Sequence, residues 1–436
     1  MDGQERLWGE VESRRDEYTS LLRQLVRVSE GGEEATQELV ARRLEGLGCR
    51  VEVVRRDPRS ITPKYEFASG HVVEPGERVT VVGKLAGSGG GRSLLFFAHP
   101  DSEPVHGIDA WTHPPFAGET EGGRMYGWGV ADDLLGVATM AAALDAIVAA
   151  GLRPRGDVLL VSAPSKRHGR GIIAALDRGY AADGAVYLHP AESGHGLREI
   201  KAFTSGMLMF RIRVAGRPPD TQEPSHTAFC HLAVNPVEKM WMVYQALQEL
   251  AERRAREVHH PLLDAAVGRS TNLQVSHVRC GDEGQLARIG CEGVLAGAIS
   301  FPPGEQMADV QRHVAGAVEA AAAADEWLRD HPPALEWLSG TTAVEVPAEH
   351  PLFQAVSRSV AAVTGAEPRV YPLHSASDIR NPMLHRGIPT VGLGSLAGDL
   401  SQAGSHDEWV DLADYLRAVK ACASLIVEWC GVEESG

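Results

Sequence analysis

The sequence has no surplus of basic residues and no long hydrophobic run. Its 436 residues contain 42 Lys and Arg against 58 Asp and Glu, which gives a formal net charge of −16. Such an acidic chain is not expected to bind nucleic acid or an anionic membrane surface. The longest apolar stretch, residues 137–152, is interrupted by Asp145 and is too short to span a bilayer, so it indicates a core helix. The first residues also lack the apolar stretch of a secretory signal.

Cysteine is scarce, and no CxxC pair is present. Scattered cysteines in a chain of this length are most simply buried thiols of a reducing cytoplasm, although Cys280 and Cys291 could meet across a hairpin. We therefore expect a cytoplasmic protein with free thiols. The six cysteines are Cys49, Cys230, Cys280, Cys291, Cys422 and Cys430.

Alternating strand-like and helix-like segments predict an α/β fold, a sheet with helices on both faces. The expected strands are 49–54, 79–85, 93–97, 157–162 and 184–188, and the expected helices between them are 134–150 and 171–179. The Gly-rich segment 87–91 is expected to form a hairpin turn between two of these strands.

The pattern changes near residue 203. The expected strands 207–215, 272–278 and 293–301 and the expected helices 234–258 and 306–328 describe a compact α+β unit. We therefore expect a discontinuous α/β domain, residues 1–203 and 332–436, with an inserted domain at 204–331.

Three segments carry side chains that can bind metal ions. LLFFAHPDSEP places His99 and Asp101 two residues apart at the end of a buried strand, so that Asp101 can orient the His99 ring. MYGWGVADDLLG delivers Asp132 and Asp133 to a helix start, where N-capping is the simpler role. A late loop, GSHDEWV, carries His406, and a lone loop histidine is usually only solvated.

Together, the HxD pair, the GxGxxD turn and the late histidine after the strand GIPTVGLG resemble the dinuclear-zinc aminoacylase family, metallopeptidase family twenty. This family includes acetylornithine deacetylases, succinyl-diaminopimelate desuccinylases, aminoacylases and carboxypeptidases of the G type. The resemblance covers nearly the whole chain. It implies a mixed-sheet, zinc-exopeptidase-like catalytic domain with helices on both faces. It also implies an inserted α+β, ferredoxin-like lid domain through which the protein forms a homodimer.

The resemblance also assigns roles to single residues. His99 would bind one metal ion, His406 the other, and Asp132 would bridge them and precede a cis peptide bond. In the lid motif SHTAFCHLAVNPVEK, His226 would reach across the dimer to stabilise the oxyanion, and Asn235 would contact the substrate.

In SASDIR, Arg380 resembles a clamp for a substrate carboxylate, and the alternative is a salt bridge to Asp378 or to a helix acid. We therefore expect a small-molecule substrate that carries a carboxylate.

The sequence departs from the family at three positions. The paired glutamates, one the general base and the other a ligand of the second metal, are replaced by Ser165 and Lys166. The acidic ligand of a strand-end motif is replaced by His189, and imidazole is a good zinc ligand.

The remaining ligands favour a single metal ion. His99, Asp132 and His189 would hold one divalent ion with room for water, zinc by expectation and manganese or cobalt as alternatives. The other site retains Asp132 and His406 but gains an ammonium that repels a dication. We therefore expect that site to be empty, weak or filled by Lys166 paired with Asp132.

Without the glutamate base, another group must move protons. Lys166 with a depressed pKa is one candidate, and His168, Asp133 and Glu192 are others, although each also has a simpler structural role. The predicted catalytic residues are Asp101, Lys166 and His226.

The leading hypothesis is a metal-dependent hydrolase of an amide-type C–N bond in a small N-acyl amino acid or related carboxylate. Two alternatives stay open at this point. One is an acyl-transfer, condensation or lyase enzyme on the same scaffold, and the other is a non-catalytic binding protein.

Overall fold

The computed structural model describes residues 3–68, 73–166, 170–190, 193–371, 377–398 and 406–434. Its central sheet has six strands in the order β1-β3-β8-β4-β9-β18. The last four of these are parallel to one another, whereas β1 and β3 are antiparallel to their neighbours. The strands are β1 (Arg50–Arg56), β3 (Arg78–Leu85), β4 (Leu94–Ala98), β8 (Val158–Ser162), β9 (Gly184–Leu188) and β18 (Thr390–Leu393).

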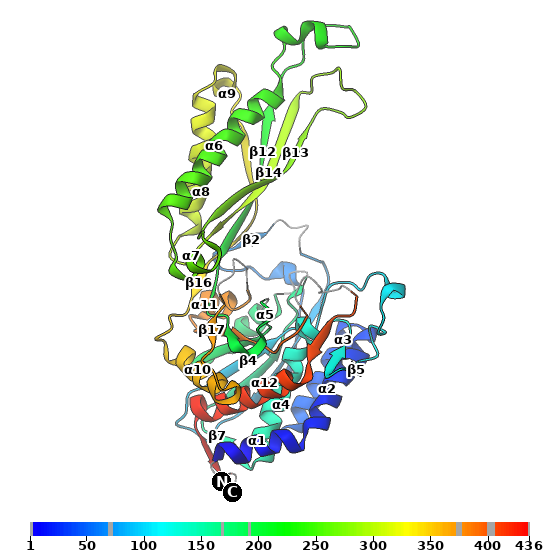
Figure 1. Ribbon diagram of the computed structural model, residues 1–436, viewed down its shortest axis with the longest axis vertical. Coiled ribbons are helices and arrows are strands. Elements are labelled where there is room, and N and C mark those ends of the chain that lie inside the picture. Colours follow the sequence, from blue (N-terminus) through cyan, green and yellow to red (C-terminus); the bar gives the residue numbers. More distant parts are fainter. Residues whose placement is uncertain are drawn as a thin grey trace.

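Helices cover both faces of this sheet (Figure 1). Every residue of β4, β8 and β9 is buried, as expected for parallel strands between two helical layers. One face packs on α1 (Gly3–Ser13), α2 (Arg15–Val28), α3 (Glu33–Gly46), α4 (Leu135–Ala149), α10 (Pro351–Thr364) and α12 (Leu412–Leu425). The other face packs on α5 (Gly171–Asp177) and α11 (Arg380–Arg386). The mixed sheet between helical layers is the predicted fold class.

A second sheet extends away from the first as an arm, residues 206–341 (Figure 1). Its five antiparallel strands have the order β13-β14-β12-β15-β2. They are β12 (Gly206–Ala215), β13 (Asn272–Cys280), β14 (Glu292–Phe301), β15 (Ala334–Thr341) and β2 (Phe67–Ala68), and the long helices are α6 (Pro236–Glu257) and α8 (Met307–Ala323). Alternate side chains of β12, such as Phe210, are buried with these two helices. Two of the strands, β15 and β2, lie outside the predicted range 204–331.

The expected hairpin at residues 87–91 is wrong, because β8 lies between β3 and β4 in the sheet. This loop instead runs against the chain near residue 155. A Cβ atom at Gly87 would lie 2.2 Å from the carbonyl oxygen of Arg155, and one at Gly91 would lie 1.9 Å from that of Cys430. The glycines therefore permit close backbone contact rather than a tight turn.

Short elements complete the fold. They are β5 (Glu119–Glu121), β6 (Arg124–Tyr126), β7 (Leu152–Pro154), β10 (Glu199–Ile200), β11 (Phe203–Thr204), β16 (Val344–Glu345), β17 (Arg369–Val370), β19 (Trp409–Asp411), β20 (Val432–Glu434), α7 (Pro261–Val267) and α9 (Glu326–Asp330). None of the helices in the described ranges has the length and apolar character needed to cross a bilayer.

All six cysteines are free, but only three of them are buried. Cys230 and Cys291 are exposed and Cys280 is half-buried, which corrects the expectation of buried thiols. Cys280 lies opposite Gly293 in the register of β13 and β14, so Cys291 falls beyond the paired residues and the two thiols do not meet across the hairpin.

Candidate metal centre and active site

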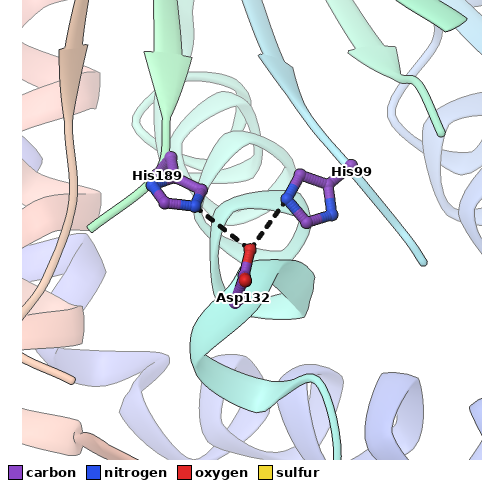
Figure 2. Close-up of side chains that lie close together, drawn as sticks. All are labelled: His99, Asp132 and His189. Atoms are coloured by element: carbon purple, nitrogen blue, oxygen red, sulfur yellow. Dashed lines mark hydrogen bonds and ion pairs between the residues drawn. The ribbon is translucent and has the colours of Figure 1, made fainter. Parts of the chain in front are cut away.

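Three of the four predicted metal ligands lie together at one edge of the central sheet. His99 follows β4, His189 follows β9, and Asp132 lies in the irregular turn Val130–Leu134 that leads into α4. Because β4 and β9 are neighbouring parallel strands, their carboxyl ends bring the two rings to the same edge. Figure 2 shows both rings pointing at the Asp132 carboxylate. One ligand atom from each residue lies within 4.8 Å of the others, and all three residues are buried.

The hydrogen bonds of the two imidazoles prepare them to bind a metal. The Nδ1 atom of His99 lies 2.7 Å from the carbonyl oxygen of Asp101, and the Nδ1 atom of His189 lies 2.9 Å from that of Pro190. A neutral imidazole that donates from Nδ1 keeps a lone pair on Nε2. The two Nε2 atoms lie 2.9 Å and 3.1 Å from Oδ1 of Asp132. Once the Nε2 proton of His99 is lost, lone pairs of three acceptors converge, and two imidazoles with one carboxylate form a donor set that fits zinc.

The charges of these groups agree with a site for a cation. Burial alone would lower the pKa of His99, but the Asp132 carboxylate outweighs it and raises this pKa to about 9. Burial and the Lys201 ammonium lower the pKa of His189. Burial alone would raise the pKa of Asp132, yet the two imidazoles hold it well below its usual value. Without a metal, the group therefore holds a proton on His99.

Lys166 occupies the other side of the same carboxylate. Its Nζ lies 2.5 Å from Oδ2 of Asp132, which is the ion pair that was one of the three alternatives expected from the sequence for the second site. The predicted depressed pKa of Lys166 is wrong: burial alone would lower this pKa, but the charge of Asp132 outweighs burial and raises it. Lys166 is therefore an ammonium in this structure rather than a neutral base.

Of the three other predicted proton carriers, two lie outside the described residues, and the third, Asp133, is buried. His168 and Glu192 are not among the residues that the structure describes. Burial raises the pKa of Asp133 well above its usual value. Its Oδ2 accepts the His99 backbone N–H at 3.3 Å. The peptide bond between Asp132 and Asp133 is cis, as predicted.

Asp101 supports His99 in a different way from the one expected. Its backbone carbonyl accepts from the imidazole, whereas its carboxylate lies 3.6 Å from Nδ1. The carboxylate instead accepts from Arg78 Nη2 at 2.8 Å and from the backbone N–H of Ser165 at 2.9 Å. Arg78 also pairs with Glu33, so a charged network absent from the sequence prediction anchors this side of the site.

His406 is not part of the group of ligand atoms found among the described residues. Its side chain is exposed, and its ring makes an edge contact with Trp111 at 6.4 Å between centroids. Its assignment as a ligand of a second metal stays a prediction.

A buried glutamate near His406 positions the loop that carries Asp132. Both oxygens of the Glu408 carboxylate accept backbone N–H groups, from Gly129 at 2.9 Å, Ala131 at 2.7 Å and Asp132 at 3.1 Å. Burial, together with the Asp132 charge, raises the pKa of Glu408 to about 8. Sequence reasoning missed this residue, and the only signal was an acidic side chain in the motif next to His406.

Arg380 has the contacts of the alternative interpretation rather than those of a substrate clamp. Its Nε donates to Glu66 at 2.6 Å and its Nη1 donates to Asp378 at 3.1 Å. Two carboxylates therefore already neutralise this guanidinium inside the protein. The predicted clamp role of Arg380 finds no support in these contacts, and Glu66 was not predicted at all.

His226 and Asn235 line a different cavity, of about 470 Å³, between the segment before α6 and the loop that joins β13 and β14. This loop lies at the end of the arm away from the central sheet (Figure 1). The Nδ1 atom of His226 accepts the backbone N–H of Ile289 at 3.0 Å. The side chain of Asn235 accepts the N–H of Val237 at 3.1 Å and so caps α6. The structure thus brings these two residues together with each other and not with the metal ligands.

A buried group of candidate metal ligands lies at one edge of the sheet in an α/β domain that carries an inserted α+β arm. This arrangement agrees with the predicted class, a metal-dependent hydrolase, and comparisons with known proteins identify the family. Residues 95–428 match the model of peptidase family M20/M25/M40, so the chain belongs to that family. The predicted family, fold class and enzyme class, a hydrolase of C–N bonds, are thereby confirmed.

Individual relatives align with between 44% and 99% of the chain. It is 26% identical over 454 residues to N-formyl-4-amino-5-aminomethyl-2-methylpyrimidine deformylase of Halalkalibacterium halodurans, covering 99% of this chain and 98% of that protein. It is 31% identical over 199 residues to succinyl-diaminopimelate desuccinylase of Alkalilimnicola ehrlichii, covering 44% and 48%. The crystal structure of aminopeptidase PepT from Bacillus cereus aligns with a TM-score of 0.69 at 16% identity, covering 95% and 98%.

Proposed function

We propose that the protein hydrolyses an amide-type C–N bond in a small N-acylated compound that carries a carboxylate, and that it uses one divalent metal ion. The observation that carries this proposal is the convergence of His99, Asp132 and His189 through two Nε2 atoms and one carboxylate oxygen. Relatives named as a deformylase and a desuccinylase support the removal of a small acyl group from nitrogen.

The metal that we propose is zinc, with manganese or cobalt as alternatives. When bound at these three residues, such an ion supplies Lewis acidity for the amide carbonyl. The Lys166 ammonium offsets the negative charge at Oδ2 of Asp132 and so takes the place of a second cation. In this arrangement His406 has no ligand role.

We also propose that residues 204–331 act as a lid and dimerisation domain and that the protein is a cytoplasmic homodimer. His226 and Asn235 lie at the far end of the arm, beside a cavity of about 470 Å³. In a dimer, a partner's arm could bring this pair to the active site, where the His226 imidazole would stabilise negative charge on the carbonyl oxygen.

Release of free amine from a defined panel tests the proposed function. The panel contains N-formyl, N-acetyl and N-succinyl amino acids and dipeptides, each assayed with chelator-treated protein and after addition of zinc, manganese or cobalt. We expect metal-dependent amine release from at least one acyl class, with Asp132→Asn as the inactive control. No release from any compound by the metal-loaded wild type contradicts the proposal.

The serine at position 165 favours one second candidate, acyl transfer. Without a glutamate at this position, an amine rather than water could accept the acyl group. The same assay repeated with hydroxylamine distinguishes the two reactions, because transfer gives a hydroxamate whereas hydrolysis gives a free carboxylate.

A further inference from the structure

We propose that Asp378 is the proton acceptor of the reaction and that it acts through the hydroxyl group of Ser165. This inference rests on the proposed hydrolytic function and names the group that replaces the missing glutamate. Asp378 lies far from Ser165 in the sequence, and the fold brings the two side chains together.

The first support is the position of Ser165 at the metal centre. Ser165 follows β8, which is the neighbour of β4, the strand that His99 follows. Its backbone N–H donates to Asp101 at 2.9 Å, and the next residue, Lys166, forms the ion pair with Asp132. The Ser165 hydroxyl therefore belongs to the residue next to Lys166, which contacts the metal-binding group.

The second support is the hydrogen bonding of Asp378. The Ser165 hydroxyl donates to its Oδ2, while its Oδ1 accepts from Arg380 Nη1 at 3.1 Å and from Asn381 Nδ2 at 3.2 Å. Oδ1 is thus fixed by two donors, and among the described residues the Ser165 hydroxyl is the donor to Oδ2. Such a chain of two oxygens can pass a proton without moving the carboxylate.

The charge of Asp378 fits this role. Burial alone would raise the pKa of Asp378, but the Arg380 guanidinium and the Ser165 hydroxyl outweigh it and hold this pKa below its usual value. Positive charge on either His99 or His189 also lowers it, which places the carboxylate within electrostatic reach of the metal ligands. Asp378 is therefore ionised and able to accept a proton, whereas the Lys166 ammonium is not.

The proposed step moves one proton from water to Asp378 and back to the leaving nitrogen. The oxygen of a water molecule bonds to the amide carbonyl carbon while one of its protons passes to Ser165 Oγ, and the hydroxyl proton of Ser165 passes to Asp378 Oδ2. The same proton then returns through Ser165 to the amide nitrogen as the C–N bond breaks. One water is consumed, the products are a carboxylic acid and an amine, and both side chains regain their initial states.

Substitutions at both positions test this relay with whichever panel compound the wild type hydrolyses. Asp378→Asn and Ser165→Ala should each lower kcat about 100-fold, and the double variant should be no slower than the slower single variant, because the residues act as one unit. Ser165→Glu in the Asp378→Asn background should recover activity. The matched control is Asp264→Asn, because Asp264 also accepts a hydrogen bond from a serine, Ser270, but lies in the arm.

Zinc affinity, measured by competition with a chelator, separates a proton acceptor from a structural support. We expect each variant to bind zinc within about twofold of the wild type. Asp378→Asn or Ser165→Ala with near wild-type kcat overturns the inference, and so does a loss of zinc affinity that parallels the loss of activity. If Asp378→Asn does not fold, Ser165→Ala decides the matter, because it leaves Asp378 and Arg380 paired. An inactive wild type, by contrast, contradicts the proposed function itself.

Discussion

Replacing Lys166 by methionine tests whether its ammonium offsets the negative charge of the buried Asp132 carboxylate. Asp132 is fully buried, the ion pair is 2.5 Å long, and 25% of the Lys166 side chain is exposed. Removing one partner of a buried ion pair costs about 3–5 kcal/mol, because the other charge is left unpaired. Because part of the Lys166 side chain contacts solvent and Asp132 keeps its contacts to His99 and His189, we expect the free energy of unfolding of the metal-free protein to fall by the lower value, about 3 kcal/mol.

Urea unfolding of chelator-treated protein measures this change. The matched control is Lys166→Arg, which keeps the positive charge and should lower the midpoint less than Lys166→Met does. Saturating zinc should reduce the difference between Lys166→Met and the wild type, because a divalent ion also compensates Asp132. Equal midpoints for the metal-free wild type and Lys166→Met would refute the reasoning, because the ammonium would then contribute nothing to the buried carboxylate.

Substitutions at three further residues test other contacts of the site. His189→Ala should weaken zinc affinity about 100-fold or more, whereas His189→Asp should retain most of it in a chelator competition; wild-type affinity in His189→Ala would exclude this residue as a ligand. Glu408→Ala leaves three backbone N–H groups without their acceptor and should weaken zinc affinity about tenfold in the same assay, and no change would show that Asp132 does not need this support. Arg380→Ala should lower the free energy of unfolding by about 3 kcal/mol, because Glu66 and Asp378 lose their shared cation. A higher KM with unchanged urea unfolding would instead support the clamp role of Arg380.

Hydrophobic periodicity predicts the separate elements of this fold well. The expected strands 184–188 and 293–301 agree with β9 and β14 to within one residue, because runs of apolar side chains mark buried strands. The expected helix 306–328 is divided in the structure, since the side chain of Asp325 accepts the N–H of Leu328 and starts α9 after α8 has ended. The order of strands in the sheet is harder to predict from the sequence. The place of β8 between β3 and β4 depends on pairing between distant segments, which no local sequence pattern indicates.

The same distinction applies to the candidate site. His99, Asp132 and His189 each follow or precede a well-marked element, so motifs at the element ends identify all three. The residues around them are joined by contacts between distant parts of the chain. Arg380 and Glu66 are separated by 314 positions, and Ser165 and Asp378 by 213. Only the folded structure brings such pairs together, which is why the sequence left both a substrate clamp and a salt bridge open for Arg380.

The zinc content of the purified protein tests the account most directly. The protein is loaded with excess zinc, dialysed against metal-free buffer and analysed by mass spectrometry for metal and by amino-acid analysis for protein. The account predicts one zinc ion per chain in the wild type and none in Asp132→Asn, which removes the charge shared by both imidazoles. Two tightly held ions per chain, or an Asp132→Asn variant that retains its zinc, would contradict it.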